Sequence, residues 1–272
     1  MRNVIVSISL FAVLTTGLLS LNSFTSDRNE VNAQFEMRSV TNNAFTYGEA
    51  LNYRVHYGFV NAGTIEMKVK DKPVMINGRK TYHIDGIGKS KSGFDWIFKV
   101  RDHFESYLDS QSILPLQFVK TQKEGGYEDT DFVIFDHKKK KYFSKKGSKD
   151  APVDIQDVIS VAYYARTVDV KNAKMGTEFT LNVYLDNEIH SLKFKVDKRE
   201  VIDTDLGKVN AILIIPQVIS GRVFKDKEAL KVWVSDDENK VPLRIQAEIL
   251  VGSIKADITG YSGLKHAINF SK

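Results

Sequence analysis

The sequence predicts a mainly β fold, in which a curved antiparallel sheet forms a barrel or half-barrel with one central packing helix. Three observations lead to this prediction. Short runs with an apolar residue at every second position recur along most of the chain, as in strands with one buried face. Turn-forming residues separate these runs at short spacing, which is typical of antiparallel sheets that curl toward barrels. After residue 35, only one convincing stretch has the apolar spacing of an amphipathic helix.

The first half of the chain alternates in this way from its start. Residues 51–57 and 65–69 each carry apolar side chains at every second position. Asn77-Gly78 is a strong hairpin signal, because both residues tolerate the positive φ angles of a tight turn. Pro115 has no amide hydrogen to donate, which indicates a strand start or an edge strand. The basic turn at residues 136–141 is expected to join two further strands.

Residues 92–107 are rich in aromatic side chains and are predicted to form one long strand. Its buried side would carry Trp96, Phe98 and Val100, and Asp102 would lie on the same side. A buried carboxylate there would need a cationic or hydrogen-bonding partner. These four residues are the candidate ligand-binding site, because aromatic side chains on a curved sheet could line a cavity for a lipid or another apolar ligand. The alternative is that they form an ordinary sheet core.

The predicted helix covers residues 154–166. Its apolar residues fall at i, i+3, i+4 and i+7, and therefore on one face: Ile155, Val158, Ile159 and Ala162. We expect this face to pack against the sheet and Ser160 to lie on the other side. Asp154 is expected to cap the first turn, and Arg166 lies where the helix dipole favours a cation.

The second half returns to strands. Residues 179–185 alternate and turn at Asp186-Asn187, and residues 211–215 are apolar on both faces, which indicates a central strand. The longest alternation covers residues 243–251 and is broken by Gly252. Further strands are expected at residues 192–196, 230–235 and 254–258, with a turn at 204–207.

The N-terminus carries a targeting signal. Arg2 precedes an uncharged stretch of 18 residues, 4–21, and Ala33 ends a small-residue cleavage site, so residues 1–33 are interpreted as a secretory signal peptide with its cleavage region. An uncleaved membrane anchor is the alternative, because an uncharged stretch of 18 residues can just span a bilayer. Both interpretations predict a periplasmic or secreted protein.

The rest of the chain is expected to form a flexible lead-in at residues 34–45 and a single β-rich domain at residues 46–265. Hydrophobic and charged contents of 42% and 27% are ordinary for a globular protein, and the net charge of +5 favours acidic surfaces only weakly. The chain has no cysteine, which excludes disulfides, thiolate metal sites, a cysteine nucleophile and the acylated cysteine of a bacterial lipoprotein.

We predict no catalytic residues, no metal site and no cofactor. The densest charged patch runs from Asp95 to Glu105, and it is interpreted as a solvated strand face rather than an active site. Arg101 and Asp102 are adjacent in a strand, so their side chains should point to opposite faces of the sheet. The six histidines never form a closely spaced ligand pair, and a zinc site assembled from distant strands is the alternative.

Several stretches form an ordered set along the chain: residues 48–58, followed by Ala62-Gly63-Thr64, and residues 94–102, 156–160, 233–244 and 251–257. Taken in this order, they resemble the exported bacterial family called domain of unknown function 3108. Together they run from about residue 46 to 261. The resemblance implies a periplasmic or secreted β-rich domain, and it implies no activity or catalytic residues.

The sequence thus predicts a non-enzymatic cell-envelope protein that binds a hydrophobic ligand or a protein partner on its curved sheet. Two alternatives remain open: a structural or interaction module with a filled core, and an unrecognised hydrolase. We expect no nucleic-acid partner, because the N-terminal segment predicts export. Membrane contact is expected only through the N-terminal segment or the basic hairpin around residues 138–149.

Overall fold

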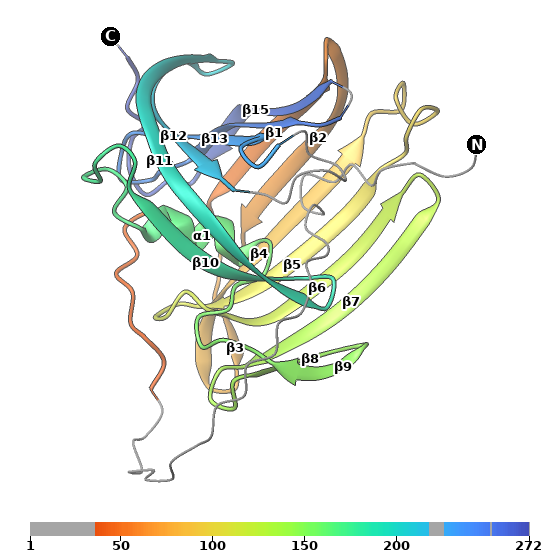
Figure 1. The fold of residues 1–272 in the computed structure, drawn as a ribbon, viewed down its shortest axis with the longest axis vertical. Coiled ribbons are helices and arrows are strands. Elements are labelled where there is room, and N and C mark those ends of the chain that lie inside the picture. Colours follow the sequence, from red (N-terminus) through yellow and green to blue (C-terminus); the bar gives the residue numbers. More distant parts are fainter. Residues whose placement is uncertain (1–35, 218–225, 251, 272) are drawn as a thin grey trace.

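A computed structural model describes residues 36–217, 226–250 and 252–271 (Figure 1). The predicted signal peptide, residues 1–33, lies outside the described residues. Within those ranges, no helix is long and apolar enough to cross a bilayer.

Fifteen strands of the described chain form one antiparallel sheet. The strands before the helix are β1 (Ala50–Tyr57), β2 (Val60–Val69), β3 (Val74–Ile76), β4 (Arg79–Ser90), β5 (Arg101–Asp109), β6 (Pro115–Glu124), β7 (Tyr127–Asp136), β8 (Lys141–Ser144) and β9 (Gly147–Asp150). The strands after it are β10 (Glu178–Leu185), β11 (Glu188–Thr204), β12 (Gly207–Pro216), β13 (Leu230–Ser235), β14 (Pro242–Glu248) and β15 (Ser253–Ser262).

The sheet curls but does not close. β1 pairs with β15, so the two halves of the chain join in the middle of the sheet, and β9 and β10 are its two end strands, which do not pair with each other. The long strand β11 arches across the front of the curl in Figure 1. The predicted curved antiparallel sheet of barrel or half-barrel form is therefore confirmed.

Most strands lie where alternation predicted them, because their apolar residues share one buried face. The Asn77-Gly78 hairpin forms with both residues at positive φ, and β6 begins at Pro115. The strand predicted at residues 211–215 is buried on both faces within β12, and Gly252 separates β14 from β15.

The helix α1 (Ser160–Thr167) lies inside the curl (Figure 1). Ile155 and Ile159 are buried as predicted, but the segment before Ser160 is not helical. The Asp157 carboxylate accepts hydrogen bonds from the amides of Ile159 and Ser160 at 2.8 and 2.7 Å, and this local turn replaces the first predicted helical turns.

The shorter helix changes which side chains are buried. Ala162, predicted on the packing face, is exposed, and Ser160, predicted on the other side, is buried. Tyr163 and Arg166 are also buried. The cap predicted at Asp154 is also wrong, because Asp157 makes the contacts at the start of the helix and Asp154 pairs with Arg38 at 3.0 Å.

The strand predicted at residues 92–107 forms only from Arg101 onward. Residues 92–97 instead make consecutive tight turns, with the amide of Phe98 donating to the carbonyl of Phe94 at 3.1 Å. The Asp95 carboxylate binds Ser90 and the Arg101 guanidinium, the latter at 2.7 Å, and so closes the loop on itself. Side-chain contacts of this kind override an alternating pattern.

Segments at both ends of the domain pack against the sheet. In the described part of the lead-in, Phe45 is buried and the amide of Val40 donates to the carbonyl of Gln111 at 2.8 Å. Near the C-terminus, Ile268 is buried and Phe270 forms a bridge with Val209 on β12.

Candidate functional site

Four connections between strands lie side by side at one end of the sheet. The strand register shows this, because Tyr57 pairs with Ile254 and Val100 pairs with Glu124. Figure 1 shows these connections in a row at the upper right. We call this end, formed by residues 58–60, 91–99, 125–127 and 249–250, the turn end.

Large apolar side chains stand exposed at the turn end. In the described chain, seven such side chains are more than half exposed, and six of them belong to this end: Phe59, Val60, Trp96, Ile97, Tyr127 and Leu250. We call these six the apolar rim. The seventh, Met75, lies on β3. Apolar side chains exposed singly are ordinary, but a cluster of them marks an interaction surface.

The structure separates the four residues predicted to bind a ligand. Trp96, predicted to be buried, is 82% exposed, because the loop at residues 91–99 carries it away from the sheet. Phe98 packs on Gly125, where a Cβ atom would lie 2.4 Å from the ring. Val100 is half-buried beside Glu124.

Asp102 lies on the inner face of β5 and is buried, as predicted. The amide of Lys123 donates to its carboxylate at 3.0 Å, and the buried carboxyl group of Glu124 is its charged neighbour. Burial, followed by the charge of Glu124, raises the pKa of Asp102 to about 8. The expected hydrogen-bonding partner is present, but the charge that most affects Asp102 belongs to another acid, Glu124, rather than to a cation.

A row of buried polar residues on β6 escaped the sequence interpretation. Lys120, Gln122 and Glu124 follow Phe118 at every second position on the inner face of the strand. Strand alternation, which predicted the apolar faces of other strands, also puts these three polar residues on one face of β6 and could have identified them. Their polarity shows that the core becomes polar toward the turn end.

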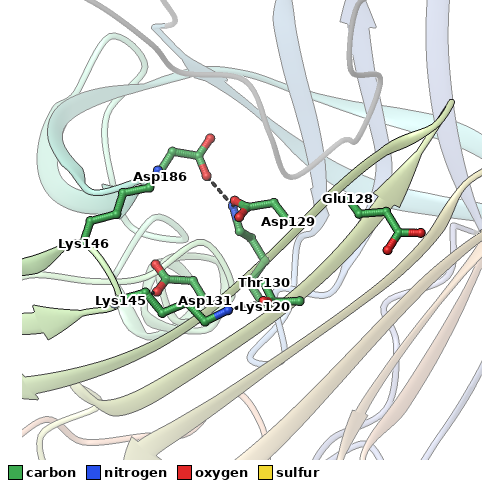
Figure 2. A pocket seen from close by; sticks show the side chains of 8 residues that line it. All are labelled: Lys120, Glu128, Asp129, Thr130, Asp131, Lys145, Lys146 and Asp186. Carbon is green, nitrogen blue, oxygen red and sulfur yellow. Dashed lines mark hydrogen bonds and ion pairs between the residues drawn. The ribbon is translucent and has the colours of Figure 1, made fainter.

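A polar pocket of about 340 Å³ opens beside this row (Figure 2). It is lined by Lys120, Glu128, Asp129, Thr130, Asp131, Lys145, Lys146 and Asp186. The ammonium group of Lys120 contacts Asp129 at 2.7 Å and Asp186 at 2.5 Å. Burial opposes the charge of Lys120, but these two carboxylates outweigh it and raise its pKa. The buried cation is therefore neutralised by the protein itself, and the residues that line the pocket are charged or polar rather than apolar.

One group of side chains in the described chain has the composition and proximity of metal ligands. Asp85, His103 and Glu105 lie on neighbouring strands β4 and β5, on the outer face of the sheet. None of them was predicted as a ligand, because His103 is brought next to Asp85 only by strand pairing.

Solved structures resemble this chain in fold. A beta-barrel-like protein of domain of unknown function DUF1849 from Brucella abortus matches with a TM-score of 0.53 and 9% identity, covering 81% of this chain and 99% of that one. At this identity the likeness concerns the fold alone. A candidate lipoprotein from Parabacteroides distasonis matches more weakly, with a TM-score of 0.36 and 13% identity over 83% of this chain and 100% of that one.

Among curated proteins, none matches the chain in sequence. A family model does match it, over residues 52–259, and the family is described as "Protein of unknown function (DUF3108)". The match covers most of the chain and nearly all of its sheet, from β1 to β15. The protein therefore belongs to the DUF3108 family.

Proposed function

We propose that this protein is an exported, non-enzymatic protein of the cell envelope that docks on a lipid membrane through its apolar rim. The observation that carries the proposal is the gathering of six strongly exposed apolar side chains on neighbouring connections at one end of the sheet. Trp and Tyr, both present in the rim, favour the interface between acyl chains and headgroups because one end of each side chain is apolar and the other polar.

The charges near the rim suit a membrane with anionic lipids. Lys91 and Lys99 bracket the loop that carries Trp96, and no described carboxylate forms an ion pair with either of them. A lysine close to an anionic membrane surface contributes about 1 kcal/mol to binding. This contact differs from the one expected from the sequence, which involved only the N-terminal segment or the basic hairpin.

A membrane surface suits the turn end better than a single enclosed lipid does. Ile155, Ile159 and Tyr163 fill the curl of the sheet with protein side chains. The pocket beside the turn end is lined by charged groups. An acyl chain would therefore find apolar surface on the rim rather than inside the curl.

The arrangement of the charged patch supports a non-enzymatic role. Arg101 is paired with Asp95 on the surface loop, whereas Asp102 lies on the inner face of the sheet. The two side chains do not share one space in which a substrate could be held by both. An active site that uses Arg101 and Asp102 together is thus not supported.

Vesicle flotation tests the proposal. Wild-type protein is expected to float with vesicles of phosphatidylglycerol and phosphatidylcholine. The double variant Phe59→Ser, Trp96→Ser should float far less, because each buried aromatic side chain is worth on the order of 2 kcal/mol. The matched control is Phe132→Ser, Phe143→Ser, which removes two exposed rings from β7 and β8.

The control variant should float as well as the wild type. If wild-type protein does not bind these vesicles, or if the rim and control variants lose binding equally, membrane docking by the rim is wrong. The structural or interaction module would then be the better account.

A further inference from the structure

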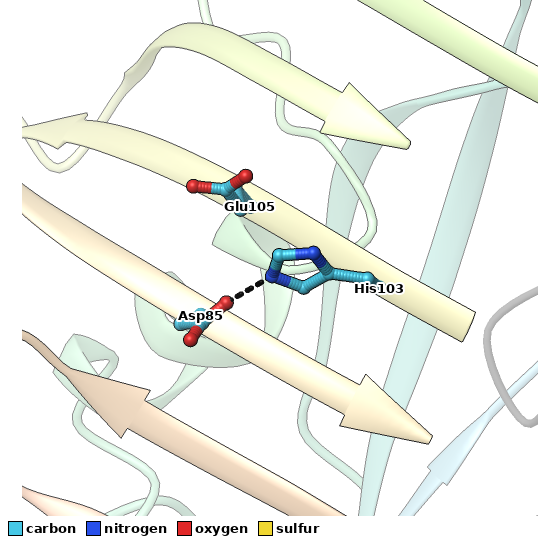
Figure 3. A group of neighbouring side chains, drawn as sticks. All are labelled: Asp85, His103 and Glu105. Carbon is cyan, nitrogen blue, oxygen red and sulfur yellow. Dashed lines mark hydrogen bonds and ion pairs between the residues drawn. The ribbon is translucent and has the colours of Figure 1, made fainter. Parts of the chain in front are cut away.

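A cluster of polar side chains on the outer face of the sheet is independent of the turn end. Asp85 on β4 lies directly opposite Glu105 on β5, and His103 lies two residues from Glu105 on the same face. One ligand atom from each of the three side chains lies within 4.8 Å of the other two. Figure 3 shows the His103 ring beside the two carboxylates, in contact with Asp85.

Neighbouring groups anchor one oxygen of each carboxylate. Lys70 binds Oδ2 of Asp85 at 2.8 Å, and the other oxygen, Oδ1, faces Nε2 of His103. Oε2 of Glu105 contacts the ring of His83 at 2.6 Å. In the described chain no hydrogen bond is made to Oε1 of Glu105. Asp85 is therefore held by one oxygen and presents the other to His103, and Glu105 is held by one oxygen, as the carboxylate ligands of metals commonly are.

The charges of the cluster favour a cation. Like charges placed directly opposite each other across a strand pair are unfavourable, and Asp85 and Glu105 form such a pair. Lys70 supplies one positive charge against the two carboxylates. The His103 side chain is 45% exposed, so an ion can reach the group from solvent.

We propose that Asp85, His103 and Glu105 form a zinc site. An imidazole and two carboxylates are typical zinc ligands, with water completing the coordination of a three-ligand site. The imidazole disfavours Mg²⁺ and Ca²⁺, which prefer all-oxygen coordination. On binding, Zn²⁺ would replace the present contact between His103 and Asp85. The carboxylate of Glu105 would move toward the ion.

Calorimetric titration of the chelator-treated protein with ZnCl₂ tests the site. The wild type is expected to bind one equivalent of Zn²⁺, with no competition from Mg²⁺ or Ca²⁺. His103→Ala should abolish this binding, and His83→Gln, which removes the support of Glu105, should weaken it roughly 10- to 100-fold. Thermal melting of each variant establishes that it remains folded.

His56→Ala is the matched control, because His56 is also a surface histidine close to a carboxylate, with Asp257 at 3.7 Å. It should bind Zn²⁺ as the wild type does. Co²⁺ bound to the wild type should give a visible absorption band that His103→Ala lacks. Absence of saturable Zn²⁺ binding by the wild type, or unchanged binding by folded His103→Ala, would overturn the proposal.

Discussion

Arg166, in the last turn of α1, forms a two-pronged ion pair with Glu49 just before β1. Nη1 lies 2.6 Å from Oε1, Nη2 lies 2.8 Å from Oε2, and both side chains are almost fully buried. The guanidinium also donates to the carbonyls of Ala44 and Asn239, each at 2.9 Å. This ion pair fixes the helix inside the curl. The sequence indicated only a favourable interaction of Arg166 with the helix dipole.

Removing one partner of this pair should be costly. Glu49→Gln would leave the buried guanidinium without a counter-charge, and we expect a loss of about 3–5 kcal/mol in the free energy of unfolding. The control is Lys171→Met, which breaks an exposed pair with Glu238 and should cost less than about 1 kcal/mol. Urea denaturation followed by circular dichroism measures both. Equal losses would mean that the Arg166 pair is not buried in solution.

The structure also changes which helix substitutions should matter. Ile159→Ala removes a fully buried side chain from the core and is expected to cost about 2–5 kcal/mol. Ala162→Ser should change stability by no more than about 0.5 kcal/mol, because Ala162 is exposed. Ser160→Asp is now expected to be destabilising, because the Ser160 hydroxyl is buried against Asp157. Melting temperatures rank the three variants, and a tolerated Ser160→Asp would contradict the observed helix position.

Asp102 should make stability depend on pH. Its pKa is raised from an ordinary value near 3.8 to about 8, so the native state binds this proton more tightly than the unfolded state does. The stabilisation is complete below about pH 4 and is lost as the pH rises through about 8. Asp102→Asn imitates the neutral carboxyl group, so the variant should not lose this stability as the pH rises.

The variant is therefore expected to be more stable than the wild type at about pH 9, with a smaller advantage or none at about pH 5. The sequence predicted a cationic or hydrogen-bonding partner for a buried Asp102; the Lys123 amide is such a hydrogen-bonding partner, but the charged neighbour is the acid Glu124. The midpoints of urea denaturation of the two proteins, measured at both pH values, test this expectation. Parallel pH profiles for the two proteins would show that Asp102 titrates normally.

Export remains a prediction from residues 1–33. If the segment is a cleaved signal peptide, intact-mass measurement of protein from the cell envelope should place the first residue near Ala33 or Gln34. Protein that begins at Met1 and sediments with membranes would instead support the uncleaved anchor.

The parts of the fold that the sequence predicted are those governed by local rules. The hairpin at Asn77-Gly78 and the alternation in β2 depend on backbone φ preferences and on burial of one strand face. The loop at residues 91–99 was predicted wrongly because its shape depends on Asp95 reaching Ser90 and Arg101, a contact that strand alternation does not reveal.

The candidate sites were harder to predict for the same physical reason. Asp85 and His103 are 18 positions apart and meet only through the pairing of β4 with β5. The apolar rim combines side chains from four connections, so its members are neighbours only once the register of the sheet is known. Trp96 was predicted to be buried on the sheet, and this prediction was wrong because the side chain is exposed.

Depth-dependent quenching of Trp96 fluorescence tests membrane docking most directly. The chain has two tryptophans, so Trp233→Phe leaves Trp96 as the only one. Trp233 lies on the sheet, where its indole N–H donates a hydrogen bond to Glu200. With anionic vesicles, Trp96 emission should shift to shorter wavelength and be quenched by lipids brominated on their acyl chains. Unchanged emission and no quenching at high vesicle concentration would contradict docking through the apolar rim.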